Sequence, residues 1–196
     1  MKVEIRSDSV HISGYVNAVD RYSRVLKDKN GRRFREKILP GAFSRSMKRC
    51  PDVKVMLNHE RALTQVNTDG ITLKEDNIGL YFDGEIRDKE VIERARAGKL
   101  VGWSFGFTLG EHTDTPSGCD EYDFERAVKE LGLLEVSIID DRYNPCYEAT
   151  SLQARAEAEA FVRACDEKPE ITEISSENFA AKNALRKRRL DIKKRK

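Results

Sequence analysis

The alternation of apolar and polar positions predicts that the first 140 residues are mostly β-strands. Residues 10–16 alternate as a half-buried strand does, and residues 53–57 form an apolar, β-branched run of strand length. Residues 71–73 and 80–82 flank a turn-rich stretch that ends in Gly79, which predicts a hairpin with a left-handed residue at its end. We therefore expect a β-rich body.

Residues 100–109 have a sharper pattern, in which one face of the predicted strand is bulky and the other is nearly bare. The bulky face can pack on a core. On the bare face, the glycines beside Ser104 would let a peptide backbone approach its hydroxyl group, as a nucleophile requires. They are equally explained by a close neighbouring strand or a bulge. The bare face consists of Gly102, Ser104, Gly106 and Thr108.

Residues 133–139 form another apolar strand, with a carboxylate inside it. Glu135 shares a face with Ser137 and lies opposite Leu134, Val136 and Ile138. If this face is buried, Glu135 needs a histidine, a basic residue or backbone donors, because an unpaired buried charge costs several kcal/mol. If the face is exposed, the carboxylate lies in water, and spacing alone does not choose between these arrangements.

Turn and capping residues predict the remaining elements of the body. Residues 28–31 form a turn, and Pro40-Gly41 opens a short helix that extends through Met47. Asp88 caps a second helix, which Gly98 ends. Residues 113–118 read as a loop.

A different composition begins near Asn144-Pro145. Residues 148–164 have helical composition until Pro169 interrupts it, and residues 175–177 are suited to cap a second helix that leads into a basic end. We place the domain boundary after residue 152, with a body at 1–152 and a helical, basic tail at 153–196.

Charge separates the same two parts. The chain has 196 residues and a net charge of +2, yet residues 182–196 alone carry +8 and the preceding 181 residues carry −6. Such a basic end is ordinarily a solvated tail. Its functional interpretation is a tether to the acidic surface of a partner protein.

Composition excludes several classes of protein. With 39% hydrophobic and 36% charged residues, the chain can fold around one core. No apolar run approaches the roughly 20 residues that span a bilayer, and the alternating charges of residues 1–6 do not form a secretory signal. The four cysteines form no CxxC pair, and neither a metal-ligand cluster nor a phosphate-binding glycine loop is present. We expect a cytoplasmic protein without metal or cofactor.

The chain has three histidines, so the choice of a general base is short. His59 follows the strand 53–57, and strand ends commonly present functional side chains. His11 lies inside an alternating strand and His112 precedes the loop 113–118, where surface histidines are ordinary. His112 is kept as an alternative third member, since a histidine can also orient a catalytic histidine.

These segments together resemble the prohead (capsid maturation) serine proteases of tailed phages. The resemblance spans about residues 10–152 and follows the order histidine, serine, acid. It rests on 58–60 (Asn-His-Glu), 103–107 (Trp-Ser-Phe-Gly-Phe), 134–137 (Leu-Glu-Val-Ser) and 144–145 (Asn-Pro), supported by 39–43 and 79–80.

The resemblance implies an α+β, mainly β fold: a compact β-barrel flanked by helices, similar to the herpesvirus assemblins. It implies a serine endopeptidase with His59 as base, Ser104 as nucleophile and Glu135 as the third member. Arg142, which follows the Glu135 strand, is an oxyanion-side candidate, with a solvated loop charge as the alternative.

The implied substrates are the major capsid protein precursor or scaffold protein, and the chain itself, cleaved inside the immature capsid in the cytoplasm of the infected bacterium. Analogy with the assemblins implies a homodimer. One alternative is a non-catalytic scaffold or capsid-assembly module of the same fold. Another is nucleic-acid binding, but the tail lacks interleaved aromatic residues and the body is acidic.

Overall fold

The computed structural model describes residues 1–68, 70–142, 160–165 and 170–173, and in them the protein is mainly β. The helices are α1 (Ala42–Arg49) and α2 (Lys89–Arg96). The strands are β1 (Lys2–Ile5), β2 (Val10–Ala18), β3 (Leu26–Lys27), β4 (Arg33–Ile38), β5 (Lys54–Leu57), β6 (Arg61–Gln65), β7 (Thr72–Glu75), β8 (Gly79–Ile86), β9 (Leu100–Leu109), β10 (His112–Pro116), β11 (Phe124–Val128), β12 (Leu131–Asp140), β13 (Ala160–Cys165) and β14 (Glu170–Glu173).

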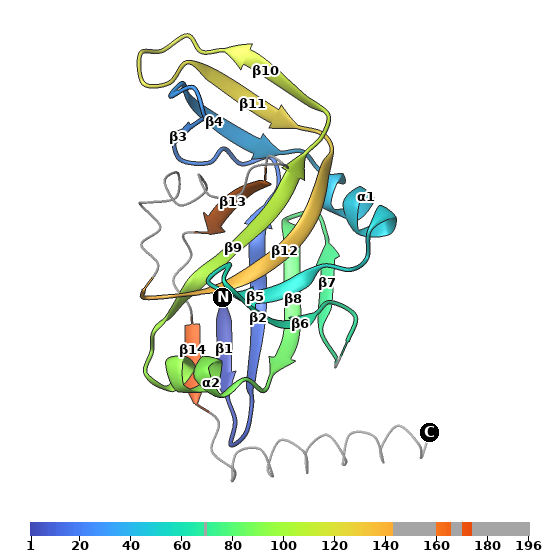
Figure 1. The fold of residues 1–196 in the computed structure, drawn as a ribbon, viewed down its shortest axis with the longest axis vertical. Coiled ribbons are helices and arrows are strands. Elements are labelled where there is room, and N and C mark those ends of the chain that lie inside the picture. Colours follow the sequence, from blue (N-terminus) through green and yellow to red (C-terminus); the bar gives the residue numbers. More distant parts are fainter. Residues whose placement is uncertain (69, 143–159, 166–169, 174–196) are drawn as a thin grey trace, which may run out of the picture.

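The strands form three sheets, with the orders β14-β1-β2-β8-β7, β10-β11-β4-β3 and β13-β9-β12-β5-β6. The longest pairing joins β9 and β12, which run antiparallel and side by side (Figure 1). Beside them, β5 runs parallel to β12. The third sheet thus brings the strands of the predicted histidine, serine and acid together.

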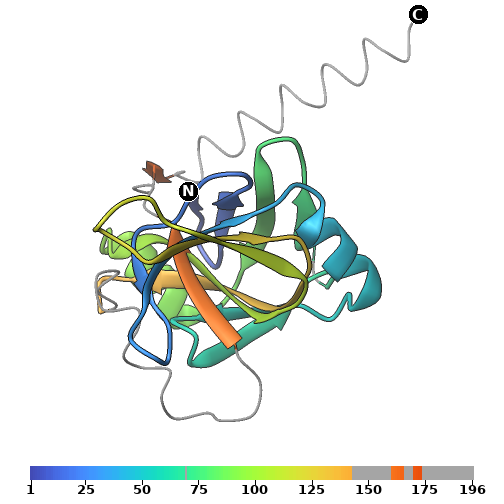
Figure 2. The ribbon, with the colours of Figure 1, turned by 90° about the horizontal axis from the view of Figure 1, so that it is seen from above.

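The α+β, mainly β class is confirmed, but the predicted compact β-barrel is not closed, because the three sheets of the described residues are open. Closure would require every strand to be paired on both sides, whereas β6, β7, β3 and β10 each have one neighbour in the described chain. Figure 2 shows the ribbon from above. Leu26, Phe34 and Phe124 of the second sheet form a small cluster of their own, whereas the first and third sheets share the main core. Its largest fully buried side chains include Trp103, Phe82, Phe105 and Phe107.

Both predicted helices are present. Helix α1 follows Gly41, which has φ of 85°. Asp88 accepts a hydrogen bond from the backbone N–H of Val91 at 3.1 Å and so caps α2, as predicted. Beyond α2, Gly98 has φ of 67°, in keeping with its predicted role at the helix end.

Two local predictions need correction. The predicted loop at 113–118 is a strand as far as Pro116, since β10 pairs with β11; all its residues are exposed, so no apolar pattern marked it. The hairpin of β7 and β8 is present, but Gly79 is not among the residues with positive φ. A Cβ atom at Gly79 would lie 2.0 Å from the backbone oxygen of Asn17, so this glycine permits a close strand approach.

The helix predicted over residues 148–164 is wrong at its end, where residues 160–165 form β13. Strand β13 pairs antiparallel with β9, and β14 pairs parallel with β1. Pairing with an available sheet edge thus overrides the local helical composition. The rest of that helix, the boundary at Asn144-Pro145 and the second helix near 175–177 lie outside the described residues.

Candidate active site

His59 lies just beyond β5, where the chain turns sharply. Asn58 and His59 have φ values of 54° and 61°, a left-handed conformation that is uncommon for residues other than glycine. The backbone N–H of buried Asn58 donates to Ile138 O at 3.0 Å, and its Oδ1 atom accepts from the backbone N–H of Asp140 at 3.0 Å. These bonds to β12 hold the turn, and non-glycine backbone in such a conformation is typical of functional sites.

The turn brings the His59 imidazole to Glu135. The distance from His59 Nδ1 to Glu135 Oε1 is 2.7 Å, and Glu135 is only 9% exposed. The carboxylate is therefore buried and partnered, which decides between the two arrangements that spacing left open. With an ionised carboxylate accepting at Nδ1, the hydrogen lies on Nδ1, and in the neutral ring Nε2 is then the basic nitrogen.

Ser137 joins the carboxylate to the histidine backbone. Its Oγ atom donates to Glu135 Oε2 at 2.6 Å and accepts from the backbone N–H of His59 at 3.1 Å. Hydrogen bonds to a charged group are worth roughly 1.5–3 kcal/mol each. Sequence reasoning placed Ser137 on the face of Glu135 but assigned it no role; its spacing of two residues along a strand was the available signal.

A β-bulge and a glycine make room for Glu135. The pairing of β12 with β9 shifts between Leu133 and Glu135, and Leu134 is exposed, so the apolar face predicted to include Leu134 is interrupted there. Glu135 pairs with Gly106, where a Cβ atom would lie 2.6 Å from Glu135 Oε1. Because Gly106 has no side chain, there is room beside it for the Glu135 carboxylate of the neighbouring strand.

Ser104 lies next to this cluster. It pairs directly with Ser137 across β9 and β12, so both side chains project from the same face of the sheet. Ser104 is 1% exposed, and its Oγ atom has no hydrogen-bond partner in the described part of the chain. Catalytic hydrogen bonds in substrate-free enzymes are often long and tighten only with substrate. A serine hydroxyl without a hydrogen-bond partner is therefore compatible with a nucleophile that contacts its base only when substrate binds.

Arg142 lies five residues beyond Ser137 and contacts other groups. Its guanidinium binds buried Asp140 at 2.8 Å and Glu90 at 2.9 Å, while Arg94 lies 3.3 Å from Asp140. Burial alone would raise the pKa of Asp140, but hydrogen bonds from Arg142 and Asn58 outweigh it and lower this pKa below its usual value. In these contacts Arg142 steadies the end of β12.

The other two histidines have partners elsewhere. His11 Nε2 lies 3.3 Å from Asp83 Oδ1, and exposed His112 has Nδ1 2.8 Å from Gly110 O. The side chain that contacts His59 Nδ1 is that of Glu135.

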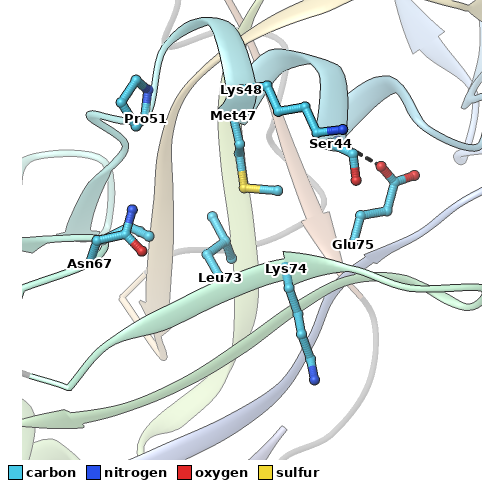
Figure 3. Close-up of a pocket in the computed structure, with 9 residues that line it drawn as sticks. Ser44, Met47, Lys48, Pro51, Asn67, Leu73, Lys74 and Glu75 are labelled. Carbon is cyan, nitrogen blue, oxygen red and sulfur yellow. Dashed lines mark hydrogen bonds between the residues drawn. The ribbon is translucent and has the colours of Figure 1, made fainter.

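A separate pocket lies between α1 and β7 (Figure 3). Its volume of about 260 Å³ is below the 300–1,000 Å³ usual for ligand sites. Glu75, at its rim, accepts backbone hydrogen bonds from Gly41 and Ser44 at 2.7 Å and so anchors the start of α1. None of the residues that line the pocket belongs to the histidine–carboxylate cluster, which consists of His59, Glu135 and Ser137.

A sequence model of the caudovirus prohead serine proteases matches residues 1–163. The chain belongs to this family. Membership makes this prohead protease, in general terms, a serine protease of phage capsid maturation. No curated protein and no solved structure matches the chain. In the described part of this family member, neither helix has the length and apolar character needed to cross a membrane.

Proposed function

We propose that this prohead protease is a serine endopeptidase in which Ser104 is the nucleophile, His59 the general base and Glu135 the group that orients the base. The observation that carries the proposal is the 2.7 Å contact between His59 Nδ1 and Glu135 Oε1. It is made directly beside Ser104, a buried serine on the adjoining strand. The proposed substrates are the capsid protein precursor or scaffold protein, in the immature capsid within the infected host.

The chemistry follows from these positions. Ser104 Oγ attacks the scissile carbonyl carbon while His59 Nε2 takes the hydroxyl proton, and the carbonyl electrons move onto oxygen. Collapse of this intermediate breaks the C–N bond, and His59 returns the proton to the leaving amine. Water then attacks the acyl-enzyme with His59 as base and releases the acid and Ser104. Throughout, ionised Glu135 stabilises the imidazolium.

The carboxylate needs fixed geometry to do this. Ser137 binds its second oxygen, so Glu135 is held from two sides, by His59 and by Ser137. A carboxylate that rotated freely would accept from Nδ1 only part of the time, and the orientation of the imidazole ring would then not be fixed.

The oxyanion of the intermediate also needs donors. Arg142 remains our candidate on that side of the site, and it would have to exchange a contact with Asp140 or Glu90 for one with the oxyanion. Replacing Arg142 with lysine keeps the charge and loses the bidentate geometry. If Arg142 acts on the oxyanion, kcat should fall by about 10²-fold or more, as for loss of an oxyanion donor; a change in thermal stability alone would leave it a structural residue.

The test is cleavage of co-expressed capsid precursor, followed by gel and mass spectrometry, with wild-type protein, Ser104→Ala and His59→Ala. Both variants should lose cleavage while retaining the circular dichroism and unfolding midpoint of the wild type. If cleavage persists in either folded variant, the proposed catalytic site is wrong. A wild-type protein that never cleaves its partner but still enters capsids supports the alternative of a non-catalytic assembly module.

Two further proposals concern the C-terminal tail. We expect slow self-cleavage there, visible as mass loss on incubation; equal loss from Ser104→Ala would indicate a contaminating protease. We also propose that the basic end at 182–196 tethers the enzyme to acidic scaffold or capsid subunits. A chain truncated after Ala181, which keeps β13 and β14, should then be packaged less efficiently, and equal packaging would refute the tether.

A further inference from the structure

The strand that carries Ser104 has different neighbours on its two sides. On one side β12 supplies Glu135 and Ser137, so that neighbour cannot leave without dismantling the site. On the other side β13 pairs antiparallel with β9 over Ala160–Cys165, and Ala164 lies opposite Ser104. Strand β13 contributes none of the three proposed catalytic residues.

Without β13, β9 would be an edge strand with unpaired backbone N–H and C=O groups along the stretch that contains Ser104. Such an edge binds extended peptides, because backbone hydrogen bonds supply affinity for many different sequences. In the third sheet, β9 and β6 are the strands that would then form the two edges. Of these edges, only the β9 edge contains the nucleophile.

In this structure a substrate peptide cannot reach Ser104. Ser104 is 1% exposed, whereas a scissile carbonyl carbon must come within roughly 3–3.5 Å of its Oγ atom. Some part of the protein must therefore move before a peptide can react. Of the two strands that pair with β9 at Ser104, β12 and β13, only β13 can be displaced without moving Glu135 or Ser137.

We infer that β13 occupies the strand position of the substrate, so that residues 160–165 and a capsid or scaffold peptide bind to β9 in turn. This inference rests on the proposed protease function. Because the segment belongs to the same chain, it competes at an effective concentration of roughly millimolar. Substrate displaces it efficiently only at comparable concentration, such as that of densely packed subunits in a shell. Competition by β13 therefore limits cleavage before the capsid assembles.

A reversible crosslink tests this exchange. Thr108 and Ala160 lie opposite one another on β9 and β13. Directly opposite residues have Cβ atoms about 4.5–5.5 Å apart, close to the 3.5–4.5 Å that a disulfide spans. The full-length variant T108C/A160C is made with the four native cysteines replaced by serine. T108C and A160C alone are the matched controls.

Oxidation should link the two strands, seen by mass spectrometry after digestion, and reduce cleavage of capsid precursor at least tenfold. Reductant should restore the rate, and the single-cysteine controls should not respond. If the link does not form, the pairing of β13 with β9 is wrong. If the linked protein cleaves as fast as the reduced one, β13 is a permanent strand of the sheet and the inference is overturned.

A binding measurement separates this inference from the protease function. The same cysteine pair is combined with Ser104→Ala, and binding to capsid precursor is compared with and without reductant. Weaker binding of the oxidised form supports the exchange even if no variant ever shows cleavage, in which case only the proposed chemistry fails. Equal binding of the two forms overturns the inference whatever the cleavage result.

Discussion

Replacing Gly106 with alanine should impair catalysis by more than its loss of folding stability alone would explain. A Cβ atom there would lie 2.6 Å from Glu135 Oε1 and 3.3 Å from its carboxyl carbon, both closer than ordinary van der Waals contact. Gly106 is not among the residues with positive φ, so the backbone itself accepts alanine. The carboxylate would have to move by about 0.5–0.8 Å to restore ordinary contact distances.

That movement acts on the bond that orients His59. A displacement of this size, directed away from His59, lengthens the 2.7 Å contact between His59 Nδ1 and Glu135 Oε1 to about 3.2–3.5 Å, at or beyond the upper limit of the usual hydrogen-bond range. Misplacement by about 1 Å in an active site costs on the order of 10²-fold in rate. We therefore expect kcat to fall 10- to 100-fold, about 1.4–2.7 kcal/mol in activation free energy. Overpacking should destabilise the fold by about 1–3 kcal/mol.

The assay is single-turnover cleavage of purified capsid precursor, with urea unfolding measured on the same preparations. Gly132→Ala is the matched control, because its Cβ atom would lie 2.4 Å from Thr108 Oγ1 between the same two strands but outside the histidine–carboxylate cluster. This control should show a similar loss of stability and a nearly normal rate. Equal rate losses in the two variants, or a normal rate for Gly106→Ala, would refute the reasoning.

Three further predictions concern residues that hold the strands and the turn around the site in place. Ser137→Ala should lower kcat about tenfold with little change in KM, since it frees one oxygen of Glu135, and it should also lower the unfolding midpoint, because both hydrogen bonds of the buried Ser137 hydroxyl are lost. pH–rate profiles provide the check, and a pure stability loss would contradict it. Asn58→Ala should reduce the unfolding free energy by about 2–3 kcal/mol, whereas Asn58→Gly should lose less because glycine accepts φ of 54°. The third prediction concerns acid stability, because the folded-state pKa of Asp140 is lowered. The contribution of ionised Asp140 to folding stability is complete above the pKa of the unfolded state, near 3.8, and is lost as the pH falls through the lower pKa of the folded state. Between pH 6 and 2.5, the urea midpoint should therefore fall less for Arg142→Gln than for the wild type. Parallel curves for the two proteins would argue against the pairing of Arg142 with Asp140.

Prediction from the sequence succeeded where neighbouring residues carry the information. The alternation in residues 100–109 gave a strand, and Asp88 gave a helix cap, because side-chain period and capping depend on residues a few positions apart. Where the pattern was uniformly polar, as in β10, a strand was missed. The tail helix was wrong at residues 160–164 because a sheet edge was available to pair with.

At the site, the resemblance selected His59, Ser104 and Glu135, and the structure brings His59 and Glu135 into contact. Their catalytic roles stay predictions. The bridging position of Ser137 was not foreseen, since it depends on Ser137 lying opposite Ser104 and next to the turn after β5. The glycine at 106 was linked to substrate access, whereas its missing side chain leaves space for Glu135.

The sequence by itself determined the β-rich body, its main strands and helices, and a family resemblance that the family match confirms. These properties lie in local periodicity and short motifs. Only the tertiary structure decided that the sheets stay open, that Glu135 is buried against His59, and that β13 lies beside Ser104. Those outcomes depend on pairing and register between segments tens of residues apart, which backbone hydrogen bonds and core packing select together and which no local pattern encodes.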